Sequence, residues 1–374
     1  MKNKRIIAAH LLNDFSGSPL VLRQSLEVLS DSFDVHLYTS TPSGSGILSD
    51  IPNVAHHRIF YRWSPNKFIT LLLFSWSQLV LFSTLLFALK KDDTVYVNTL
   101  LPFGAVLAGA CRGCRVIYHV HEVSIKPAAL KAFLVRIAAL YADEIIFVSE
   151  FVKDQFTFPA EKTRVVYNAL PESFAKEAMK TVCPDKNYPF TVLMLCSLKA
   201  YKGIYQFVEL AKRLPNITFK LVLNASPQAV MLFQKETDTP KNCIIYPVQN
   251  NTAQFYKTAY VVVNLSLPDE WVETFGLTVL EGMYHGLPVI VPPVGGVTEL
   301  VTDGIEGIYA DSRDIQNLTD TILHLYFDDA YYRKMALSAW FRAQQFSQSA
   351  FRNGIKRAFN VKQDFVDSVP TLEV

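Results

Sequence analysis

The segment ETFGLTVLEGMYHGLPVI, residues 273–290, decides the fold because its glycines and proline are placed as in a helix that leads into a buried strand. Gly276 opens the predicted helix, which runs to about His285, and Gly286 and Pro288 end it. The apolar residues that follow are typical of a strand covered on both faces. We therefore expect this segment to belong to an α/β domain.

The same segment predicts a binding site for a diphosphate. A glycine beside a helix N-terminus lets a ligand approach backbone N–H groups that have no partner within the helix. Glu273 precedes the helix, and Glu281 lies two turns into it. One carboxylate then reaches past the phosphate site and the other reaches back beside the helix, so the two can anchor opposite ends of one ligand.

Short β-branched runs alternate with helical segments along the whole chain, which is the pattern of βαβ units. Several runs are apolar almost throughout, as in a parallel, doubly wound sheet. We predict an α/β fold of two Rossmann-like domains that face each other across a deep cleft at the carboxyl ends of their strands. The expected strands are Arg5–His10, Val35–Thr39, Thr94–Asn98, Arg115–His121, Glu144–Ser149, Phe190–Ser197, Thr218–Leu223, Cys243–Tyr246, Ala259–Leu265 and Val289–Pro292.

The domain boundaries follow from length and composition. A chain of 374 residues exceeds what one hydrophobic core usually serves. We assign residues 1–172 to the first domain and residues 190–345 to the second. The polar, proline-containing stretch 171–189 lies between them, and we predict that residues 173–189 are a linker and hinge.

A family resemblance rests on residues 273–290. Two carboxylates separated by seven residues, with Phe-Gly after the first and Gly-x-Pro-Val-Ile after the second, resemble the donor-site signature of the retaining glycosyltransferases of family 4, which have the GT-B fold. The likeness covers most of the second half and, more loosely, the whole chain. It implies that the first domain binds the acceptor and the second a nucleotide sugar, and that a C-terminal helix, about residues 346–374, packs back on the first domain.

The resemblance also implies roles for individual residues. Glu273 would contact hydroxyls of the transferred sugar, and Glu281 would accept hydrogen bonds from the ribose. The backbone amides expected to hold the diphosphate are those of Phe275, Gly276, Leu277 and Thr278. The resemblance implies that the reaction retains the anomeric configuration. Because the sequence offers neither an obvious nucleophile nor a close pair of carboxylates of the glycosidase type, we predict front-face substitution. Contacts to the base would come from the loop near 248–250.

A basic residue follows the first strand of the second half. Lys202 resembles the family residue that neutralises the leaving diphosphate, where a fixed ammonium stabilises the developing charge. The family commonly has a Gly-Arg pair five residues earlier, but this chain has Cys196 and Ser197 there. Lys199 or Lys202 alone would then supply the charge beside Ser197. The alternative is a surface lysine without a role.

In the first half, a strand ends on two histidines and a glutamate. His119 and His121 lie on the same side of a strand, so a metal pair is one interpretation, although no third ligand follows from spacing. The resemblance instead makes His121 a catalytic residue that touches the donor sugar and phosphate, with His119 packed in the core. Glu122 would orient His121 or the acceptor.

Weaker signals lie in other loops. Gly17 and Ser18 follow the first strand, where relatives have a glycine-rich loop near the phosphates and the acceptor; an ordinary turn explains them equally well. Ser149 and Asn168 end later strands and resemble family positions on the acceptor side and in the donor site. Ala169 replaces the glycine that the family has after the asparagine.

Composition excludes some functions. The net charge of +2 is too small for a nucleic-acid surface. Five scattered cysteines fit a reducing compartment, and the Cys111-x-x-Cys114 spacing lacks a second ligand pair, so small apolar residues are favoured over a metal or redox role. The N-terminus has no small-residue cleavage site and is interpreted as a first strand. We expect neither a metal nor another cofactor.

Residues 68–89 contain no charge and are long enough, as a helix, to cross a bilayer. A crossing would put the strands at 5–10 and 94–98 on opposite sides of the membrane, so an interfacial helix is favoured over a buried or spanning one. Residues 126–141, with Lys126, Lys131 and Arg136 among apolar residues, are either a second lipid-facing element or an ordinary surface helix.

Together these features predict a metal-independent glycosyltransferase that moves a sugar from a nucleotide-diphosphate sugar to a saccharide acceptor, such as a lipid-linked intermediate of a surface polysaccharide. We expect it in the cytoplasm, peripheral on the inner face of the cytoplasmic membrane. Two alternatives stay open. One is a sugar-nucleotide epimerase or hydrolase of the same fold, and the other is a non-catalytic membrane-associated scaffold.

Overall fold

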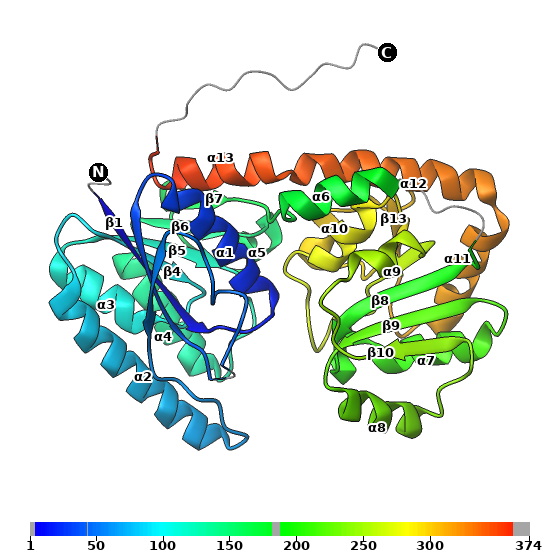
Figure 1. Ribbon diagram of the computed structural model, residues 1–374, viewed down its shortest axis with the longest axis horizontal. Helices are drawn as coiled ribbons and strands as arrows, with labels where there is room; N and C mark the ends of the chain where they lie inside the picture. Colours follow the sequence, from blue (N-terminus) through cyan, green and yellow to red (C-terminus); the bar gives the residue numbers. More distant parts are fainter. Residues whose placement is uncertain (1–3, 43, 182–187, 362–374) are drawn as a thin grey trace, which may run out of the picture.

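The computed structural model describes residues 4–42, 44–181 and 188–361, which form two α/β domains joined side by side. Figure 1 shows the first domain on the left and the second on the right, with the C-terminal helices running along one edge of both. Each domain has one parallel sheet with helices on both faces. The predicted fold class is therefore confirmed.

The sheet of the first domain has the strand order β3-β2-β1-β4-β5-β6-β7. Side chains of β1 and β4 alternate between two hydrophobic cores, one on each face of the sheet. Both faces are covered, which explains why these strands are almost wholly apolar. The strands are β1 (Arg5–Leu12), β2 (Asp34–Ser40), β3 (Val54–Arg58), β4 (Thr94–Asn98), β5 (Arg115–Val120), β6 (Glu144–Phe147) and β7 (Thr163–Val165).

Five helices position the first domain's functional loops. Helices α2 (Lys67–Ala88), α3 (Phe103–Arg112) and α4 (Ala128–Tyr141) supply the core on one face of the sheet, and α1 (Gly17–Ser30) covers the other. The short α5 (Glu150–Asp154) follows β6 at the carboxyl end of the sheet. The loops before α1, α3, α4 and α5 therefore all lie along the sheet edge that faces the second domain.

The second sheet has the order β10-β9-β8-β11-β12-β13, and its strands are parallel throughout. They are β8 (Thr191–Ser197), β9 (Thr218–Asn224), β10 (Cys243–Tyr246), β11 (Val261–Val263), β12 (Val289–Val291) and β13 (Gly307–Tyr309). The helices between them are α7 (Ile204–Arg213), α8 (Pro227–Thr237), α9 (Ala253–Lys257) and α10 (Leu277–Tyr284), and α11 (Ile315–Phe327) follows β13.

The segment predicted as a linker and hinge is partly helical. Helix α6 covers Glu172–Ala178, and the 3-10 turn η2 covers Met179–Thr181. Pro171 stands at the N-cap of α6, a position where a missing N–H costs nothing. Phe174 packs against the ring of Tyr256, so α6 belongs to the second domain's surface. Residues 182–187 of the predicted hinge lie outside the described residues.

The C-terminal helices bridge the domains. Helix α12 (Asp329–Ala343) packs against α10, and α13 (Gln348–Ala358) packs against α1. Phe351 and Ile355 of α13 are fully buried in the first domain's core. The crossing therefore ties α13, the last helix in the described residues, to the first domain (Figure 1).

Candidate active site

A cleft of about 1350 Å³ lies between the two domains. Its walls come from the loops after β1, β4 and β5 in the first domain and from the ends of β8, β9 and β11 and the start of α10 in the second. These are carboxyl ends of parallel strands, where open α/β sheets bind ligands. Val248, Gln249 and Asn250, in the loop expected to contact the base, also line the cleft.

Lys202 and Glu273 meet at the second domain's wall. The Lys202 Nζ forms an ion pair with Glu273 Oε1, and Ser266 Oγ donates a hydrogen bond to the same oxygen at 2.9 Å. Burial alone would raise the pKa of the Glu273 carboxyl, but Lys202 and the hydrogen bonds lower it below its ordinary value. The carboxyl group is therefore ionised. Lys202 and Glu273 can each form hydrogen bonds with a ligand in place of the ion pair.

Lys202 is the only lysine or arginine among the described residues that line the cleft. Its Nζ lies 4.8 Å from the centre of the Trp271 ring, which stacks on Tyr201 with 5.2 Å between ring centres. Burial raises the pKa of the Cys196 thiol to about 12, so this residue supplies no charge where the family has a Gly-Arg pair. The positive charge available to a diphosphate on this wall rests on Lys202.

Lys199, the other predicted lysine, does not belong to the site. Its side chain is exposed and does not line the cleft, although Ser197 does. The 3-10 turn η3 (Ala200–Lys202) separates the two lysines and turns only the second inward. Gly203 follows with φ of 78°, and a Cβ there would lie 2.1 Å from the carbonyl oxygen of Leu265. The turn therefore needs glycine.

The backbone at the start of α10 allows a ligand to come close to its N–H groups. Gly276 has φ of 101°, a conformation that favours glycine, and α10 begins at the next residue. The N–H groups of Leu277 and Thr278 belong to the first turn and have no carbonyl partner within the helix. Phe275, Gly276, Leu277 and Thr278 all line the cleft. The predicted phosphate site therefore opens into the cleft.

Glu281 also lines the cleft, at the far side of α10's first turns. Tyr256 on α9 donates a hydrogen bond from its hydroxyl to Glu281 Oε2 at 2.5 Å. Burial raises the pKa of the Glu281 carboxyl to about 7, although the Tyr256 hydrogen bond lowers it. The hydrogen bond orients one carboxyl oxygen and leaves the other for a ligand.

The first domain contributes His121 from the end of β5. Its Nε2 lies 2.8 Å from Asn98 Oδ1, and the Asn98 amide nitrogen lies 3.1 Å from His10 Nδ1. Burial and the neighbouring His119 and His10 lower the pKa of His121 well below its ordinary value. His121 therefore faces the cleft as a neutral, oriented imidazole.

Glu122 lines the cleft beside His121, but its carboxyl group is held by backbone. Its Oε1 accepts a hydrogen bond from Leu100 N at 2.7 Å and its Oε2 accepts one from His121 N at 3.3 Å. Burial raises the pKa of Glu122 to about 7. The contacts fix the loop after β4 against the end of β5, so Glu122 positions His121 through its backbone.

His119 lies behind the cleft wall and is fully buried. Its Nδ1 lies 2.8 Å from the Tyr96 hydroxyl, and burial lowers its pKa to about 3. Among the described residues, no three His, Cys, Asp or Glu side chains are grouped as metal ligands would be. The two histidines are thus a packed residue and a cleft residue.

Three residues of the loops that were expected to approach the ligand line the cleft. Gly17 and Ser18 line the cleft at the start of α1. Asn168 also lines it; the residue is buried, and within the described part of the chain its Oδ1 has no hydrogen-bond partner. A buried amide oxygen without a partner costs free energy, which suits a group that binds a ligand.

Ser149 differs from its predicted role. It is fully buried and does not line the cleft. Its Oγ donates a hydrogen bond to the Thr274 carbonyl oxygen at 2.7 Å, while it caps α5 by accepting one from Val152 N. Ser149 therefore joins the first domain to the backbone between Glu273 and Phe275.

Sequence reasoning missed a second contact across this interface. The Glu299 carboxylate, from the 3-10 turn η4 (Gly296–Glu299), accepts hydrogen bonds from Phe151 N at 2.6 Å and Glu150 N at 2.9 Å. A carboxylate at a helix N-terminus satisfies orphan donors and complements the helix dipole. We call Ser149 and Glu299 the interdomain clamp, because both hold α5 against the donor-site wall.

The fold and site agree with the comparisons. Residues 17–174 match the model described as Glycosyltransferase Family 4, and residues 176–339 match the model described as Glycosyl transferases group 1. The chain belongs to the family 4 glycosyltransferases and has the GT-B fold. The crystal structure of Anabaena HepE in complex with UDP-glucose matches with a TM-score of 0.74 at 18% identity, over 95% of this chain and 99% of that one.

The matches to curated relatives cover a smaller part of the chain. The D-inositol 3-phosphate glycosyltransferase of Frankia alni is 33% identical over 111 residues, which are 30% of this chain and 26% of that protein. A 42.6 kDa protein in the cps region of Klebsiella pneumoniae is 25% identical over 224 residues, 58% of this chain and 56% of that protein. The matches span less than two thirds of these relatives.

Proposed function

We propose that the protein is a retaining glycosyltransferase that transfers a sugar from a nucleotide-diphosphate sugar to a saccharide acceptor without a metal ion. The observation that carries the proposal is the grouping of three features in one cleft: the Lys202–Glu273 ion pair, the N-terminus of α10 and the Glu281 carboxyl. Each fits one part of a nucleotide sugar. HepE, which shares the fold, was solved with UDP-glucose, and this supports a donor of the same class.

In this mechanism the donor diphosphate lies against the N–H groups at the start of α10 and takes Lys202 as its counter-ion. The lysine stabilises the negative charge that grows on the phosphate as the glycosidic bond breaks. Glu273, released from Lys202, accepts hydrogen bonds from sugar hydroxyls, and Glu281 accepts them from the ribose. The leaving phosphate oxygen takes the proton of the acceptor hydroxyl, which attacks from the same face.

The first domain completes the site from the opposite wall. His121 is neutral and held by Asn98, so it serves as a hydrogen-bonding partner of the sugar or phosphate rather than as a second cation. Catalysis then rests on positioning and charge stabilisation, without a covalent intermediate. Because reacting groups come from both domains, turnover requires the domains to keep this relative arrangement.

For the acceptor we propose a lipid-linked intermediate of a surface polysaccharide. The matching protein from the cps region of Klebsiella pneumoniae supports this class, as does the long apolar helix α2. The location that follows is the cytoplasm, at the inner face of the cytoplasmic membrane. An epimerase or hydrolase would use the same donor pocket but form its product without an acceptor, and a scaffold would bind no nucleotide.

The proposal is tested first by thermal unfolding with a panel of nucleotide sugars. A ligand at about 100 times its dissociation constant stabilises the fold by about 2.7 kcal/mol. The best donor is then incubated with saccharide acceptors, and the anomeric configuration of the product is determined by NMR. An inverted product, or release of free sugar unaffected by any acceptor, would overturn the proposed reaction.

Two pairs of variants assign the roles. Lys202→Ala and Glu273→Ala are each expected to lower kcat by at least about tenfold, since each removes a group that meets the transition state. Lys199→Ala and Glu270→Ala are matched controls, because both side chains are exposed and outside the cleft lining. Equal turnover of a site variant and its control would contradict the assignment.

A further inference from the structure

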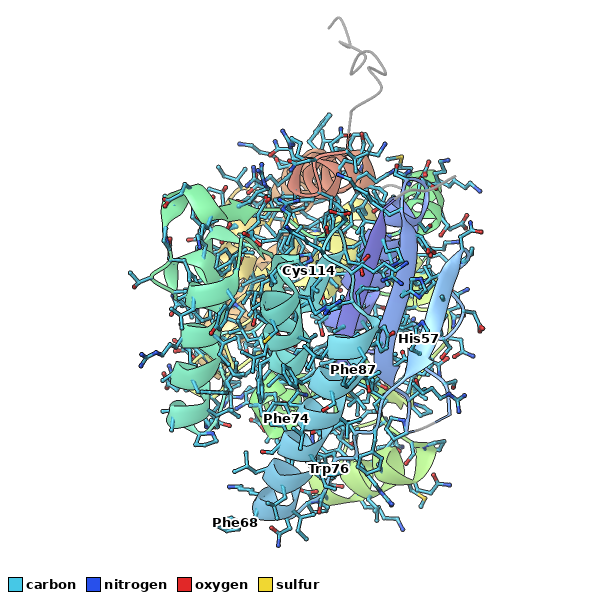
Figure 2. The ribbon with its side chains drawn as sticks, turned by 90° about the vertical axis from the view of Figure 1, so that its left-hand side faces the viewer. His57, Phe68, Phe74, Trp76, Phe87 and Cys114 are labelled. Atoms are coloured by element: carbon cyan, nitrogen blue, oxygen red, sulfur yellow. The ribbon has the colours of Figure 1, made fainter. Side chains whose placement is uncertain are left out.

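Helix α2 lacks the polar face that a surface helix normally has. Its buried residues are Phe74, Ser77, Gln78, Leu81 and Leu85, spaced as a single stripe toward α3. The remaining surface is uncharged after Lys67 and mostly apolar: Phe68 is 80% exposed, Leu72 71% and Phe87 89%. Figure 2 shows Phe68, Trp76 and Phe87 along the outer side of the helix. No charged residue lies between 68 and 89.

The helix is long enough to cross a membrane, but the sheet does not allow it. Among the described residues it is the one helix that is both long enough and apolar enough to cross a membrane. The strand before it, β3, pairs with β2, and the strand after it, β4, pairs with β1 in the same sheet. A crossing helix would place β3 and β4 on opposite sides of the bilayer and break this sheet.

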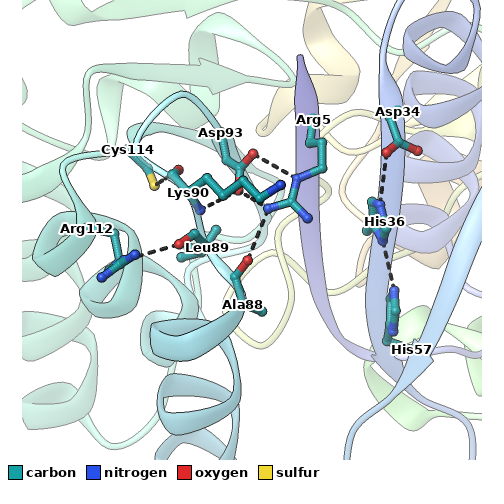
Figure 3. Close-up of polar contacts among 10 residues, drawn as sticks. All are labelled: Arg5, Asp34, His36, His57, Ala88, Leu89, Lys90, Asp93, Arg112 and Cys114. Carbon is teal, nitrogen blue, oxygen red and sulfur yellow. Dashed lines mark hydrogen bonds and ion pairs between the residues drawn. The ribbon is translucent and has the colours of Figure 1, made fainter. Parts of the chain in front are cut away.

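Helix α2 is capped at its N-terminus and fixed to the domain at its C-terminus. Asn66 caps the N-terminus by accepting hydrogen bonds from Phe68 N and Ile69 N. At the other end, Arg5 Nη2 donates to Ala88 O at 3.0 Å and Arg112 Nε donates to Leu89 O at 3.1 Å (Figure 3). The helix therefore presents its outer face as a rigid part of the first domain.

Positively charged side chains surround the exposed face of α2, so this face is suited to an anionic partner. Residues 51–141 contain ten lysines and arginines against three acidic residues. Of the three, Asp93 is buried in an ion pair with Arg5, and Glu122 belongs to the cleft. Exposed cations flank the apolar part of α2 at both ends: Arg62 and the first helical residue, Lys67, on one side, and Lys90 and Lys91 on the other. Apolar surface bordered by lysines and arginines is the pattern of interfacial membrane helices.

A second copy of the chain fits this face poorly. In a symmetric dimer the same patch meets itself. An antiparallel pair of α2 helices would bring Lys67 of one copy against Lys90 and Lys91 of the other, and a parallel pair would place like ends together. Either arrangement opposes cations, whereas lipid phosphates neutralise them.

The position of α2 links this face to the active site. Helix α3 starts just after Leu101, which lines the cleft, and its Gly104 N donates to Gln78 Oε1 at 3.0 Å. Arg112, at the end of α3, reaches Leu89, so the two helices run in the same direction. Residues 67–76 therefore project beyond the start of α3 by about 15 Å. This end of α2 lies at the lower edge of the first domain, on the side of the second (Figure 1).

We infer that α2, with Phe60 and Trp63 before it, is a fixed interfacial element that docks the first domain on a bilayer with anionic headgroups and holds the cleft beside the lipid surface. Phe60 and Trp63 are both exposed. Docking buries apolar side chains among acyl chains while the flanking cations meet lipid phosphates. The link to a lipid-linked acceptor rests on the proposed function; the docking itself does not.

The test is co-sedimentation of the full chain with vesicles of phosphatidylcholine, with or without phosphatidylglycerol. We expect tight binding to the anionic vesicles, weakened by salt. The double variant Leu72→Glu/Trp76→Glu should bind at least about tenfold less well, since it removes two exposed apolar side chains from the membrane interface. Phe327→Glu is the matched control, because Phe327 is 76% exposed on the second domain.

A second variant separates charge from apolar contact. Lys90→Glu/Lys91→Glu should lose about tenfold or more in affinity for the anionic vesicles and keep its affinity for pure phosphatidylcholine. Equal vesicle binding by wild type and Leu72→Glu/Trp76→Glu overturns the inference, as does a wild-type dimer that the double variant converts to monomer. All variants should keep the thermal stabilisation by nucleotide sugar. Loss of nucleotide binding with intact vesicle binding would refute the proposed function and leave the docking surface standing.

Discussion

The interdomain clamp yields the sharpest prediction about turnover. Glu299 accepts two backbone hydrogen bonds from α5, at 2.6 and 2.9 Å, and Ser149 reaches from the start of α5 to Thr274 beside Glu273. Replacing Glu299 with alanine removes the carboxylate that satisfies two backbone N–H groups at the start of α5, which costs about 1–2 kcal/mol. That free energy corresponds to roughly a 5- to 30-fold shift away from the arrangement in which both domains face one ligand.

We expect Glu299→Ala to lower kcat by up to a factor in this range while the affinity for nucleotide sugar falls much less, because most of the proposed donor contacts belong to the second domain. Steady-state kinetics at saturating donor and isothermal titration of the donor measure the two quantities. Glu161→Ala, at an exposed carboxyl outside the interface, is the control. The double variant Ser149→Ala/Glu299→Ala should lose more. A kcat equal to that of wild type, or a parallel loss of donor affinity, would refute the clamp.

Three further predictions concern the donor wall. Burial raises the pKa of Glu281 from 4.5 to about 7, so its contribution to stability is present below 4.5 and is lost as pH rises through about 7. In thermal unfolding between those values, Glu281→Gln should lack this loss, and parallel curves would contradict the assignment. Gly296→Ala would put a Cβ 2.0 Å from the Thr274 carbonyl oxygen, so urea unfolding should show a loss of about 1–3 kcal/mol, and a wild-type midpoint would argue against it. Excess chelator should leave turnover unchanged, and activity restored only by a divalent ion would disprove metal independence.

Central strands could be predicted because a strand that is buried on both faces has apolar residues at almost every position. The central strands β1, β4, β9 and β12 lie where such runs predicted them, and so does one edge strand, β10. The strands β3, β7 and β13 were not predicted, and all three are edge strands. An edge strand has one neighbour and more exposed residues, as in the two histidines of β3, so its pattern is weak.

Some residues of the site could likewise be predicted from the sequence, and others could not. Glu273, Gly276 and Glu281 lie close together in the sequence, around the start of α10, so their spacing alone predicted that they meet at one wall of the cleft. Their partners Ser266 and Tyr256 come from other elements, and only the packed fold brings them within hydrogen-bond distance.

The roles of two predicted residues changed for tertiary reasons. Ser149 ends a strand at the cleft edge, but the second domain covers it, so its hydroxyl meets the Thr274 carbonyl instead of a ligand. Lys199 is three residues from Lys202, yet the intervening 3-10 turn points it to solvent. Glu299, which follows a Gly-Gly pair, carried no signal of its own, because its partners are backbone N–H groups of the other domain.

The central claim is that a nucleotide diphosphate lies against the start of α10 between two carboxylates. A crystal structure of the protein with the nucleotide sugar that stabilises it most tests this directly. We predict the diphosphate on the N–H groups of Leu277 and Thr278, the ribose on Glu281 and the sugar hydroxyls on Glu273. A nucleotide bound elsewhere, or one that leaves both carboxylates untouched, would contradict the account.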